Sequence, residues 1–444
     1  MQTRTLRPIG AVILVGAFAA SPGAQSSKRA IGLDDLAKLR AVSDTQVSPD
    51  GKWVAYTVDT VNVEKDEHDT DLWMVSWDGT EQVRLTTTSD SSEHMPRWSP
   101  DNRYLAFLTS RGDEKHKKEG SQLWVLNRAG GEAQELTSIK GGVSEFAWSP
   151  DSKHLALVVR DPNPNDDPEK KEGWKRKTHP PIVIDRYHFK QDREGYLQDL
   201  HSHLSIFDLD SRKAEPLTKG RFDEEHPSWS PDGTRIAFIS NRSADPDRNR
   251  ETQVFVIDAK PGAEPHQLTT FAGTNSGRPS WSPDAKWIAY FQGEDTKFEQ
   301  YAQNKVAIVG SNGGAARILT AELDRPASGS LVWTNDSRNL LFVVDDDRVT
   351  YVAKVSASGG PVERLTTGQR VVGGLSPRDD RSFAVVSSTT QEPNEVYAFE
   401  GGAFRRLTHQ NDPLIRELQL ANTEDFTSRS KDGTEVHGIV VKPA

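Results

Sequence analysis

The sequence predicts an all-β protein, a seven-bladed β-propeller of four-stranded antiparallel blades. A turn of the Trp-Ser-Pro-Asp-Gly type occurs seven times, at 47–51, 98–102, 148–152, 229–233, 281–285, 333–337 and, in degenerate form, 375–379. The pair Leu-Thr ends a strand seven times, with its leucines at Leu85, Leu136, Leu217, Leu268, Leu319, Leu365 and Leu407. Repeats of about 40–50 residues that supply four strands each are typical of propeller blades.

Each repeat is expected to supply its four strands in the same order. A short strand leads into the turn, and an alternating run such as 52–58 follows it with the period of two that marks a half-buried strand. A second apolar run such as 71–75 comes next, and a turn such as 78–79 leads to the strand that ends in Leu-Thr. In the Ser-Pro-Asp-Gly turn, Pro fixes φ, Asp can bond the local backbone, and Gly or Asn tolerates the left-handed conformation.

Five tryptophans occupy one equivalent position of the repeat. They are Trp98, Trp148, Trp229, Trp281 and Trp333. A large ring at a repeated position predicts packing between neighbouring blades rather than five separate binding sites. The first repeat opens with its own turn and the last ends with its own Leu-Thr strand, so we expect the ring to close by apolar packing without an exchanged strand.

The first 25 residues are predicted to be a signal peptide. Arg4 and Arg7 precede an uncharged stretch at 9–20, and small residues follow it. Such a stretch is too short to span about 30 Å of hydrocarbon as a helix but fits a secretory signal, with a buried N-terminal helix as the alternative. The protein is therefore expected to be exported, to the periplasm or the medium.

The remaining chain divides into three parts. Residues 26–44 are a leading segment with a predicted short helix, in which Leu33, Leu36 and Leu39 lie near one stripe. Residues 45–420 hold the propeller. Residues 421–444 predict a strand, an Asp-Gly turn and a second strand. Because a hairpin alone is marginally stable, we interpret it as the start of a further, truncated domain.

Composition excludes several classes of protein. Hydrophobic residues make up 34% of the 444 residues, which excludes a multi-pass membrane protein, and a net charge of −10 argues against a nucleic-acid or anionic-membrane partner. The absence of cysteine excludes disulfides, thiolate metal sites and a cysteine nucleophile. The sequence also lacks G-x-S-x-G, a phosphate-binding Gly loop and H-E-x-x-H, so it predicts no catalytic residue, no metal and no cofactor.

An insertion interrupts blade three at 160–203. Leu136 and Leu217 are 81 residues apart, whereas Leu85 and Leu136 are 51 apart. The first half is rich in Pro and charge and is expected to be irregular. The second half regains alternation and carries Arg186 and Tyr187, which we take as candidate ligand contacts because loops on rigid scaffolds commonly carry function. The alternative is an extra hairpin fastened to blade three.

The sequence also contains three smaller clusters of charged or titratable residues. Glu224 and Glu225 precede the predicted innermost strand of blade four and could hold a cation such as a peptide amine, although a solvated acidic turn is the alternative. His201 and His203 share one face of a strand, but the sequence shows no third metal ligand. The acidic run 345–347 lacks the spacing of a calcium loop and predicts a hairpin tip.

The segments at the two ends of the chain resemble the N-terminal part of prolyl oligopeptidase-family serine peptidases. The resemblance is greatest to the acylaminoacyl-peptidase and dipeptidyl-aminopeptidase-like branch. It is carried by LDDLAKLRAVSDTQVSPDGKWVAYTV, by the WSPDG turns, by IDRYHFKQDREGYL…HLSIFDL and by SKDGTEVHGIVVKP. WSPDG repeats also occur in TolB-like propellers, so the end segments decide the resemblance.

The resemblance implies that residues 421–444 are the first hairpin of a truncated α/β-hydrolase domain with a Ser-His-Asp triad. It also implies that the propeller caps this hydrolase and admits short or unfolded peptides. The expected partners are a peptide substrate and the chain's own C-terminal hydrolase domain. In the dipeptidyl branch propeller carboxylates grip the substrate amine, a role open to Glu224 and Glu225. Arg186 and Tyr187 lie in the matching stretch and are the other substrate-contact candidates. The chain as given is expected to be inactive alone; the alternative is a free-standing TolB-like periplasmic propeller that acts as a protein-interaction scaffold.

Overall fold

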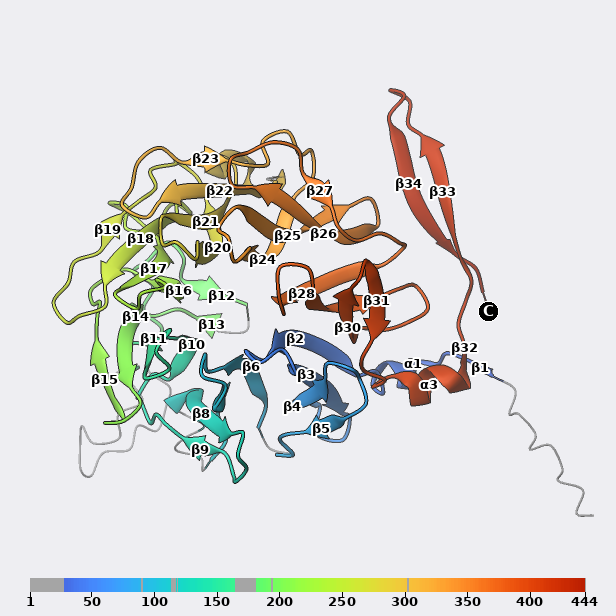
Figure 1. Cartoon of the computed structure of the whole chain (residues 1–444), viewed down its shortest axis with the longest axis horizontal. Coiled ribbons are helices and arrows are strands. Elements are labelled where there is room, and N and C mark those ends of the chain that lie inside the picture. The colour runs from blue at the N-terminus through green and yellow to red at the C-terminus, as the bar shows by residue number, and fades with distance from the viewer. Residues whose placement is uncertain are drawn as a thin grey trace, which may run out of the picture.

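Seven four-stranded antiparallel sheets stand around one axis in the computed structural model (Figure 1). The structure describes residues 28–88, 91–112, 117, 119–163, 181–192, 195–301 and 303–443. The predicted all-β, seven-bladed propeller is confirmed. The signal peptide expected at 1–25 and most of the Pro-rich half of the insertion (164–180) lie outside the described residues. No helix in the described part of the chain is long and apolar enough to cross a membrane.

The first four blades are built from consecutive strands. Blade one has β2 (Ala41–Val47), β3 (Trp53–Asn62), β4 (Glu67–Ser76) and β5 (Gln82–Arg84). Blade two has β6 (Glu93–Trp98), β7 (Tyr104–Thr109), β8 (Gln122–Asn127) and β9 (Gln134–Glu135). Blade three has β10 (Val143–Trp148), β11 (His154–Arg160), β14 (Ser202–Asp208) and β15 (Lys213–Pro216). Blade four has β16 (Glu224–Trp229), β17 (Arg235–Ser240), β18 (Gln253–Asp258) and β19 (His266–Gln267).

The last three blades repeat the pattern. Blade five has β20 (Asn275–Trp281), β21 (Trp287–Gln292), β22 (Lys305–Gly310) and β23 (Arg317–Ile318). Blade six has β24 (Ala327–Trp333), β25 (Asn339–Asp346), β26 (Val349–Ser356) and β27 (Glu363–Arg364). Blade seven has β28 (Val371–Pro377), β29 (Phe383–Ser388), β30 (Glu395–Glu400) and β31 (Ala403–Arg406). The first strands of the seven blades contact one another in a closed circle, so they surround the axis.

Short elements complete the chain outside the blades. They are β1 (Arg29–Ala30) paired in parallel with β32 (Leu418–Gln419), the helices α1 (Leu33–Leu36) and α3 (Asp412–Glu417), the 3-10 helix η2 (Thr296–Tyr301), the hairpin β12 (Lys190–Gln191) with β13 (Gly195–Tyr196), and the hairpin β33 (Thr423–Arg429) with β34 (Glu435–Val441). The predicted helix in the leading segment is only one turn long, because β2 already begins at Ala41, ahead of the expected boundary at residue 45.

The apolar core is divided among the blade interfaces. Seven clusters of buried residues occur in the described chain, one at each of the seven interfaces. At the interface of blades three and four, for example, Val158 and Leu204 pack with Ile236 and Phe238. Both faces of each blade are therefore covered, which accounts for the alternating and mostly apolar central strands.

Each of the five repeated tryptophans joins its blade to the preceding one. The indole N–H donates to a carbonyl on the innermost strand of that neighbour at 2.9–3.2 Å: Trp98 to Gln46, Trp148 to Arg97, Trp229 to Ala147, Trp281 to Ser228, and Trp333 to Ser280. A buried indole needs a partner for its N–H, and the repeat supplies one at a fixed place. The prediction of inter-blade packing is confirmed.

The two repeated sequence signatures are hydrogen-bond motifs. In the turn, Ser230 Oγ donates to Asp232 Oδ1 at 2.6 Å, and Gly233 has the left-handed φ of 70° that was expected at this position. At the strand end, Thr218 Oγ1 accepts the N–H of Leu204 at 2.8 Å. The same threonine bond recurs in all seven blades.

The ring closes between blades one and seven without an exchanged strand, as predicted. Apolar residues of both blades form one buried cluster that includes Tyr56 and Leu407. Polar contacts that the sequence did not predict also cross the seam. Arg40 N donates to Asn411 Oδ1 at 2.9 Å, and Asn411 Nδ2 donates to Arg40 O at 3.0 Å. The seam is therefore held by both apolar packing and a reciprocal backbone-to-amide pair.

The hairpin β33–β34 projects from the ring (Figure 1) and rests on the tip of blade six. The acidic run 345–347 leads into that tip, between β25 and β26, as predicted. Arg348 binds Asp425 at 2.9 Å and donates to Gly438 O at 3.0 Å. Apolar side chains at both ends of the chain are exposed, namely those of Leu33, Leu36, Ile439, Val440 and Val441.

Candidate functional site

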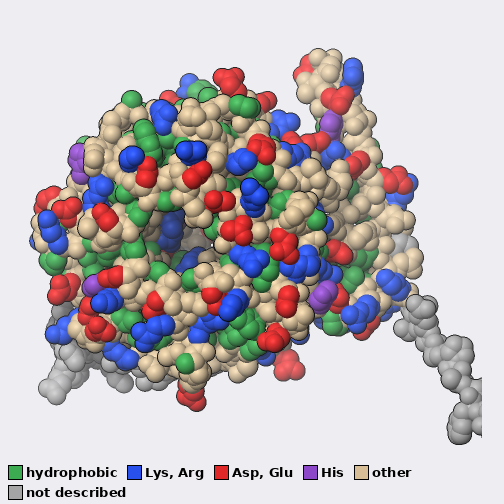
Figure 2. Space-filling view, viewed as in Figure 1, with side chains coloured by type: hydrophobic (Ala, Val, Ile, Leu, Met, Phe, Trp, Pro, Cys, Tyr) green, Lys and Arg blue, Asp and Glu red, His purple; other side chains and the backbone are tan. Residues whose placement is uncertain are grey.

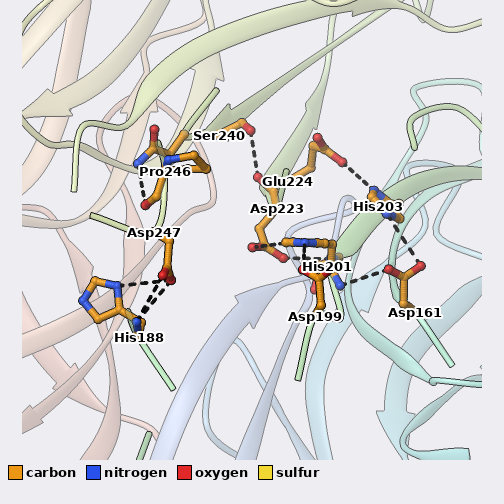
Figure 3. A network of polar contacts seen from close by, with 12 residues as sticks. Asp161, His188, Asp199, His201, His203, Asp223, Glu224, Ser240, Pro246 and Asp247 are labelled. Atoms are coloured by element: carbon orange, nitrogen blue, oxygen red, sulfur yellow. Dashed lines mark hydrogen bonds and ion pairs between the residues drawn. The ribbon is translucent and has the colours of Figure 1, made fainter. Parts of the chain in front are cut away.

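The predicted site residues lie where the insertion of blade three meets blade four. Figure 3 shows the polar network there. Arg186 and Tyr187 come from the insertion, ahead of the β12–β13 hairpin, whereas Glu224 and Glu225 begin β16 on the axial side of blade four. The structure therefore brings all four candidates to one region of the ring, but it gives them different environments.

Asp247, in the loop after β17, anchors the insertion. Arg186 donates from Nε and Nη2 to Asp247 Oδ1, both at 3.2 Å, and from Nη1 to Gln198 O at 2.9 Å. The backbone N–H groups of Tyr187 and His188 also donate to the Asp247 carboxylate. Partial burial alone would raise the pKa of Asp247, but these backbone donors and Arg186 hold it below its usual range. Arg186 is thus occupied by internal contacts and acts as an anchor.

The alternative of an extra hairpin fastened to blade three is wrong about where the hairpin is attached. A hairpin does form within the insertion, but the bonds just described fasten it to the Asp247 loop of blade four rather than to blade three alone. The reason is the charge of Asp247, which collects a guanidinium and two N–H donors from one short segment. Sequence patterns missed Asp247, because nothing in the run 241–252 marks one of its aspartates as the acceptor.

Aromatic side chains of the anchored segment face solvent. Tyr187 is 61% exposed, and the Arg248 guanidinium lies 5.1 Å from its ring centroid. Phe189 and Tyr196 stack with their centroids 6.5 Å apart and are also exposed. Tyr187 therefore stays a candidate contact residue, since its ring is accessible while its backbone is held in place.

Glu224 is fully buried at the start of β16. It accepts from Thr218 Oγ1 at 2.7 Å and from Arg242 Nη2 at 2.5 Å, and it lies 3.1 Å from His203 Nδ1. The interpretation as a solvated acidic turn is wrong for Glu224, because the residue belongs to a strand and faces a blade interface. With no exposed surface and three partners, it is a structural acid that a substrate amine cannot reach.

Glu225, one residue on, points the other way and is exposed to solvent. Among the described residues it has no hydrogen-bond or ion-pair partner. Loss of hydration by neighbouring protein atoms raises the pKa of the Glu225 carboxyl. The charge of His226 lowers this pKa, whereas the charges of Glu145 and Asp223 raise it. An accessible carboxylate that has lost part of its hydration and has no partner gains from a bound cation.

The axial opening of the ring is hollow at its mouth and has basic side chains within it (Figure 2). Ion pairs link different blades there. Arg278 of blade five contacts Glu145 of blade three at 3.0 Å, and His226 of blade four lies 3.1 Å from the same carboxylate. Burial alone would raise the pKa of Glu145, but His226 and Arg278 hold it below its usual range.

Sequence reasoning missed this set of charges, although a signal was present. Glu145, His226 and Arg278 each lie three positions before the repeated tryptophan of their blade. Arg97 of blade two pairs with Asp44 of blade one at 2.8 Å, and both of these charges act on Arg278. No three His, Asp or Glu side chains in the described part of the chain are placed to hold a metal ion. The arrangement is suited to binding charged groups.

Comparison with known proteins identifies the relatives of this chain. It is 28% identical to the uncharacterized peptidase YuxL of Bacillus subtilis over 434 residues, which cover 94% of this chain and 64% of that protein. It is 24% identical to dipeptidyl-peptidase 5 of Porphyromonas gingivalis over 455 residues, covering 98% of this chain and 64% of that protein. The homologues of this chain are peptidases. No family model matches the sequence.

Solved structures agree with the fold of this peptidase homologue. Acylaminoacyl peptidase in complex with Z-Gly-Gly-Phe-chloromethyl ketone superposes with a TM-score of 0.71 at 19% identity, over 92% of this chain and 59% of that one. The β-propeller domain of the Trilobed protease from Pyrococcus furiosus, described as having an open velcro topology, gives 0.58 at 18% identity, over 85% and 98%. The peptidase relatives and these propeller folds together confirm the predicted resemblance to prolyl oligopeptidase-family peptidases.

The match to TolB, which would support the alternative of a free-standing scaffold, covers a much shorter part of the chain. Tol-Pal system protein TolB of Alcanivorax borkumensis is 29% identical over 107 residues, only 24% of this chain. The peptidase homologue matches its peptidase relatives along nearly its whole length but spans 64% of theirs. The propeller is therefore the part of those proteins that this chain shares.

Proposed function

We propose that this chain is the substrate-admitting propeller of an exported serine peptidase that cleaves short peptides with a free or acylated amino end. The observation that carries the proposal is the match to peptidases along 94–98% of this chain, which covers 64% of each relative. The remaining part of such a protein would supply the Ser-His-Asp chemistry. Export rests on the charged and apolar pattern of residues 1–25.

Within this role, Glu225 is the receptor for a substrate amine. Its carboxylate is exposed, unpaired among the described residues, and next to the axial opening. An ammonium group would restore the interactions that Glu225 lacks, and a charge-assisted hydrogen bond of this kind contributes about 1.5–3 kcal/mol. Tyr187 offers an accessible ring on the neighbouring insertion, whereas Arg186 holds that segment in position.

The reading frame beyond residue 444 provides the first test. A continuation that carries G-x-S-x-G followed by Asp and His supports the peptidase role. A stop codon at this point, with a stable product of 444 residues, would overturn it and favour the interaction scaffold.

The second test uses that longer protein and two matched substrates, a dipeptide with a free amine and the same dipeptide N-acylated, each with a chromogenic leaving group. We expect E225Q to raise KM for the free amine about tenfold and to leave the acylated substrate unchanged, since only the amine meets the carboxylate. E132Q, in the outer turn between β8 and β9, is the control. Equal effects on both substrates would contradict the receptor role of Glu225.

A further inference from the structure

The two ends of the blade-three insertion meet at a pair of histidines. Asp161 follows β11 at the start of the insertion, and Asp199 and His201 stand at its end, just before β14. His203 lies within β14. Figure 3 shows both imidazoles between carboxylates from the insertion and from blade four. This cluster, which we call the His clasp, includes neither of the two accessible candidate contact residues, Glu225 and Tyr187.

Each histidine of the clasp faces two carboxylates. His201 Nδ1 lies 3.2 Å from Asp223 Oδ2, and its Nε2 lies 3.1 Å from Asp199 Oδ1. His203 Nδ1 lies 3.1 Å from Glu224 Oε2, and its Nε2 lies 3.6 Å from Asp161 Oδ1. The two side chains are only 12% and 13% exposed. Carboxylate oxygens therefore lie within ion-pair distance of all four ring nitrogens, three of them within hydrogen-bond distance.

The positions of these carboxylates favour the protonated, doubly donating form of both histidine rings. A neutral imidazole has one N–H and can donate to one carboxylate only, whereas the imidazolium ion donates from both nitrogens. With a neutral ring, one of the two carboxylates would face a nitrogen lone pair, which repels it. The arrangement of acceptors on both sides is complete only when His201 and His203 are protonated.

The surrounding charges act in the same direction. The groups that face the two rings are Asp161 and Asp199 from the insertion and Asp223 and Glu224 from blade four, and Arg242, after β17, is the cation bound to Glu224. Deprotonation of both histidines would leave four carboxylates with one guanidinium. The hydrogen bond to Glu224 raises the pKa of His203, although burial opposes it.

Backbone bonds couple the rings to the insertion. His201 N donates to Asp161 Oδ2 at 3.0 Å, Ser202 N donates to Asp223 Oδ1 at 2.8 Å, and Asp161 N donates to His201 O at 2.7 Å. The same carboxylates that receive the imidazoles thus also fix the two chain ends. If the rings release these carboxylates, the backbone bonds at the base weaken with them.

We propose that His201 and His203 are positioning residues that close the base of the insertion in a proton-dependent manner. At low pH the clasp is closed and the insertion is held at its base as well as at Asp247. As the pH rises and the two rings lose their protons, the base opens. The Arg186–Asp247 contact stays formed because the guanidinium keeps its charge; the His188 ring, 3.7 Å from the same carboxylate, is a further partner there.

Hydrogen–deuterium exchange of the intact 444-residue chain tests this proposal. Exchange is followed from about pH 5.5 to about pH 8.5, across the titration range of histidine, and is normalised to the intrinsic exchange rate at each pH. We expect protection at residues 160–162 and 198–203 to fall by about tenfold or more as the pH rises, because removing one member of a buried charge cluster is costly. Protection in β22 (Lys305–Gly310), a strand of blade five that contains no histidine, should stay constant and serves as the internal control.

Substitution of each histidine tests whether it causes the pH dependence of protection. H201Q and H203Q keep a polar side chain but cannot gain charge, so each should remove part of the pH dependence and lower protection at acidic pH. H154Q is the matched control, since His154 also lies between two carboxylates, Asp151 at 3.4 Å and Asp208 at 3.3 Å, but at the opposite end of β11 from Asp161. Its profile should follow that of the unmodified chain.

A flat profile in the unmodified chain would overturn the proposal, as would an unchanged profile in H201Q. If H203Q does not fold, H201Q decides, because its partners Asp199 and Asp223 lie near the surface. No peptide is used, so the result stands apart from the fate of the proposed function.

Discussion

The indole N–H of Trp333 donates to the carbonyl oxygen of Ser280 at 2.9 Å and joins blade six to blade five. Four other tryptophans make the same bond at equivalent positions. Because the apolar core lies at the interfaces between neighbouring blades, the stability of the ring depends on these repeated contacts.

Replacement of Trp333 by Phe should destabilise the protein by about 1 kcal/mol, since it keeps an aromatic ring but leaves the Ser280 carbonyl without its donor. The measurement is the free energy of unfolding in urea. Trp124 provides a control, because its buried Nε1 has no partner in the described part of the chain. W124F should cost less than W333F, and equal costs would show that ring volume rather than the hydrogen bond matters.

Exchanging residues at the left-handed turn position should change stability in opposite directions. Ala285 has φ of 59° and Gly233, its counterpart one blade earlier, has φ of 70°. Left-handed backbone costs a residue with a Cβ about 1 kcal/mol, so A285G should stabilise the protein slightly and G233A should destabilise it by about that amount. A Cβ on Gly233 would meet only Pro150 Cδ at 3.7 Å, so strain and not a clash would cause the loss. Thermal unfolding of both variants decides; shifts of the same sign would contradict the prediction.

The Ser-Pro-Asp-Gly turns should make stability fall in acid. Burial alone would raise the pKa of Asp50, but hydrogen bonds from Ser48, the Lys52 N–H and Arg128 lower it to about 2. An unfolded Asp titrates near 3.9, so the stabilisation by Asp50 is complete above about pH 4 and is lost as the pH falls toward about 2.

D50N should therefore be less stable than the unmodified protein at neutral pH and should lose less stability on acidification. Urea midpoints between about pH 5 and about pH 2.5 measure this difference. D210N, in the exposed turn after β14, is the control and should follow the unmodified curve. A D50N curve parallel to the unmodified one would rule out the role of this carboxylate.

The repeat made most of the fold predictable. Turn, strand and Leu-Thr signatures recur with fixed spacing, so blade number, strand order and the packing of Trp98 and its equivalents followed from local sequence alone. The seam pair between Arg40 and Asn411 did not, because these residues are 371 positions apart and belong to no repeat. Asp247 was missed for a similar reason, since its partners lie in another blade's insertion.

The candidate site was predictable only in part. Sequence placed Glu224 and Glu225 together, but the alternation of a strand sends one into a blade interface and leaves the other in solvent. That difference decides which of them can meet a ligand. Whether the pair began a strand or a turn was not evident from two adjacent acids.

The charges in the axial opening should be energetically coupled across blades. Arg278 contacts Glu145 at 3.0 Å from two blades away, and the guanidinium and carboxylate are largely shielded, with 34% and 16% of their side chains exposed. A double-mutant cycle of R278Q and E145Q should give a coupling free energy of about 1–3 kcal/mol, because either single change leaves a partly buried charge with fewer partners. The same cycle on Lys354 and Glu363, an outer pair at 2.7 Å with 32% and 58% exposed, should give about 0.5 kcal/mol or less. Additive effects at Arg278 and Glu145 would mean that the axial charges act independently and do not tie the blades together.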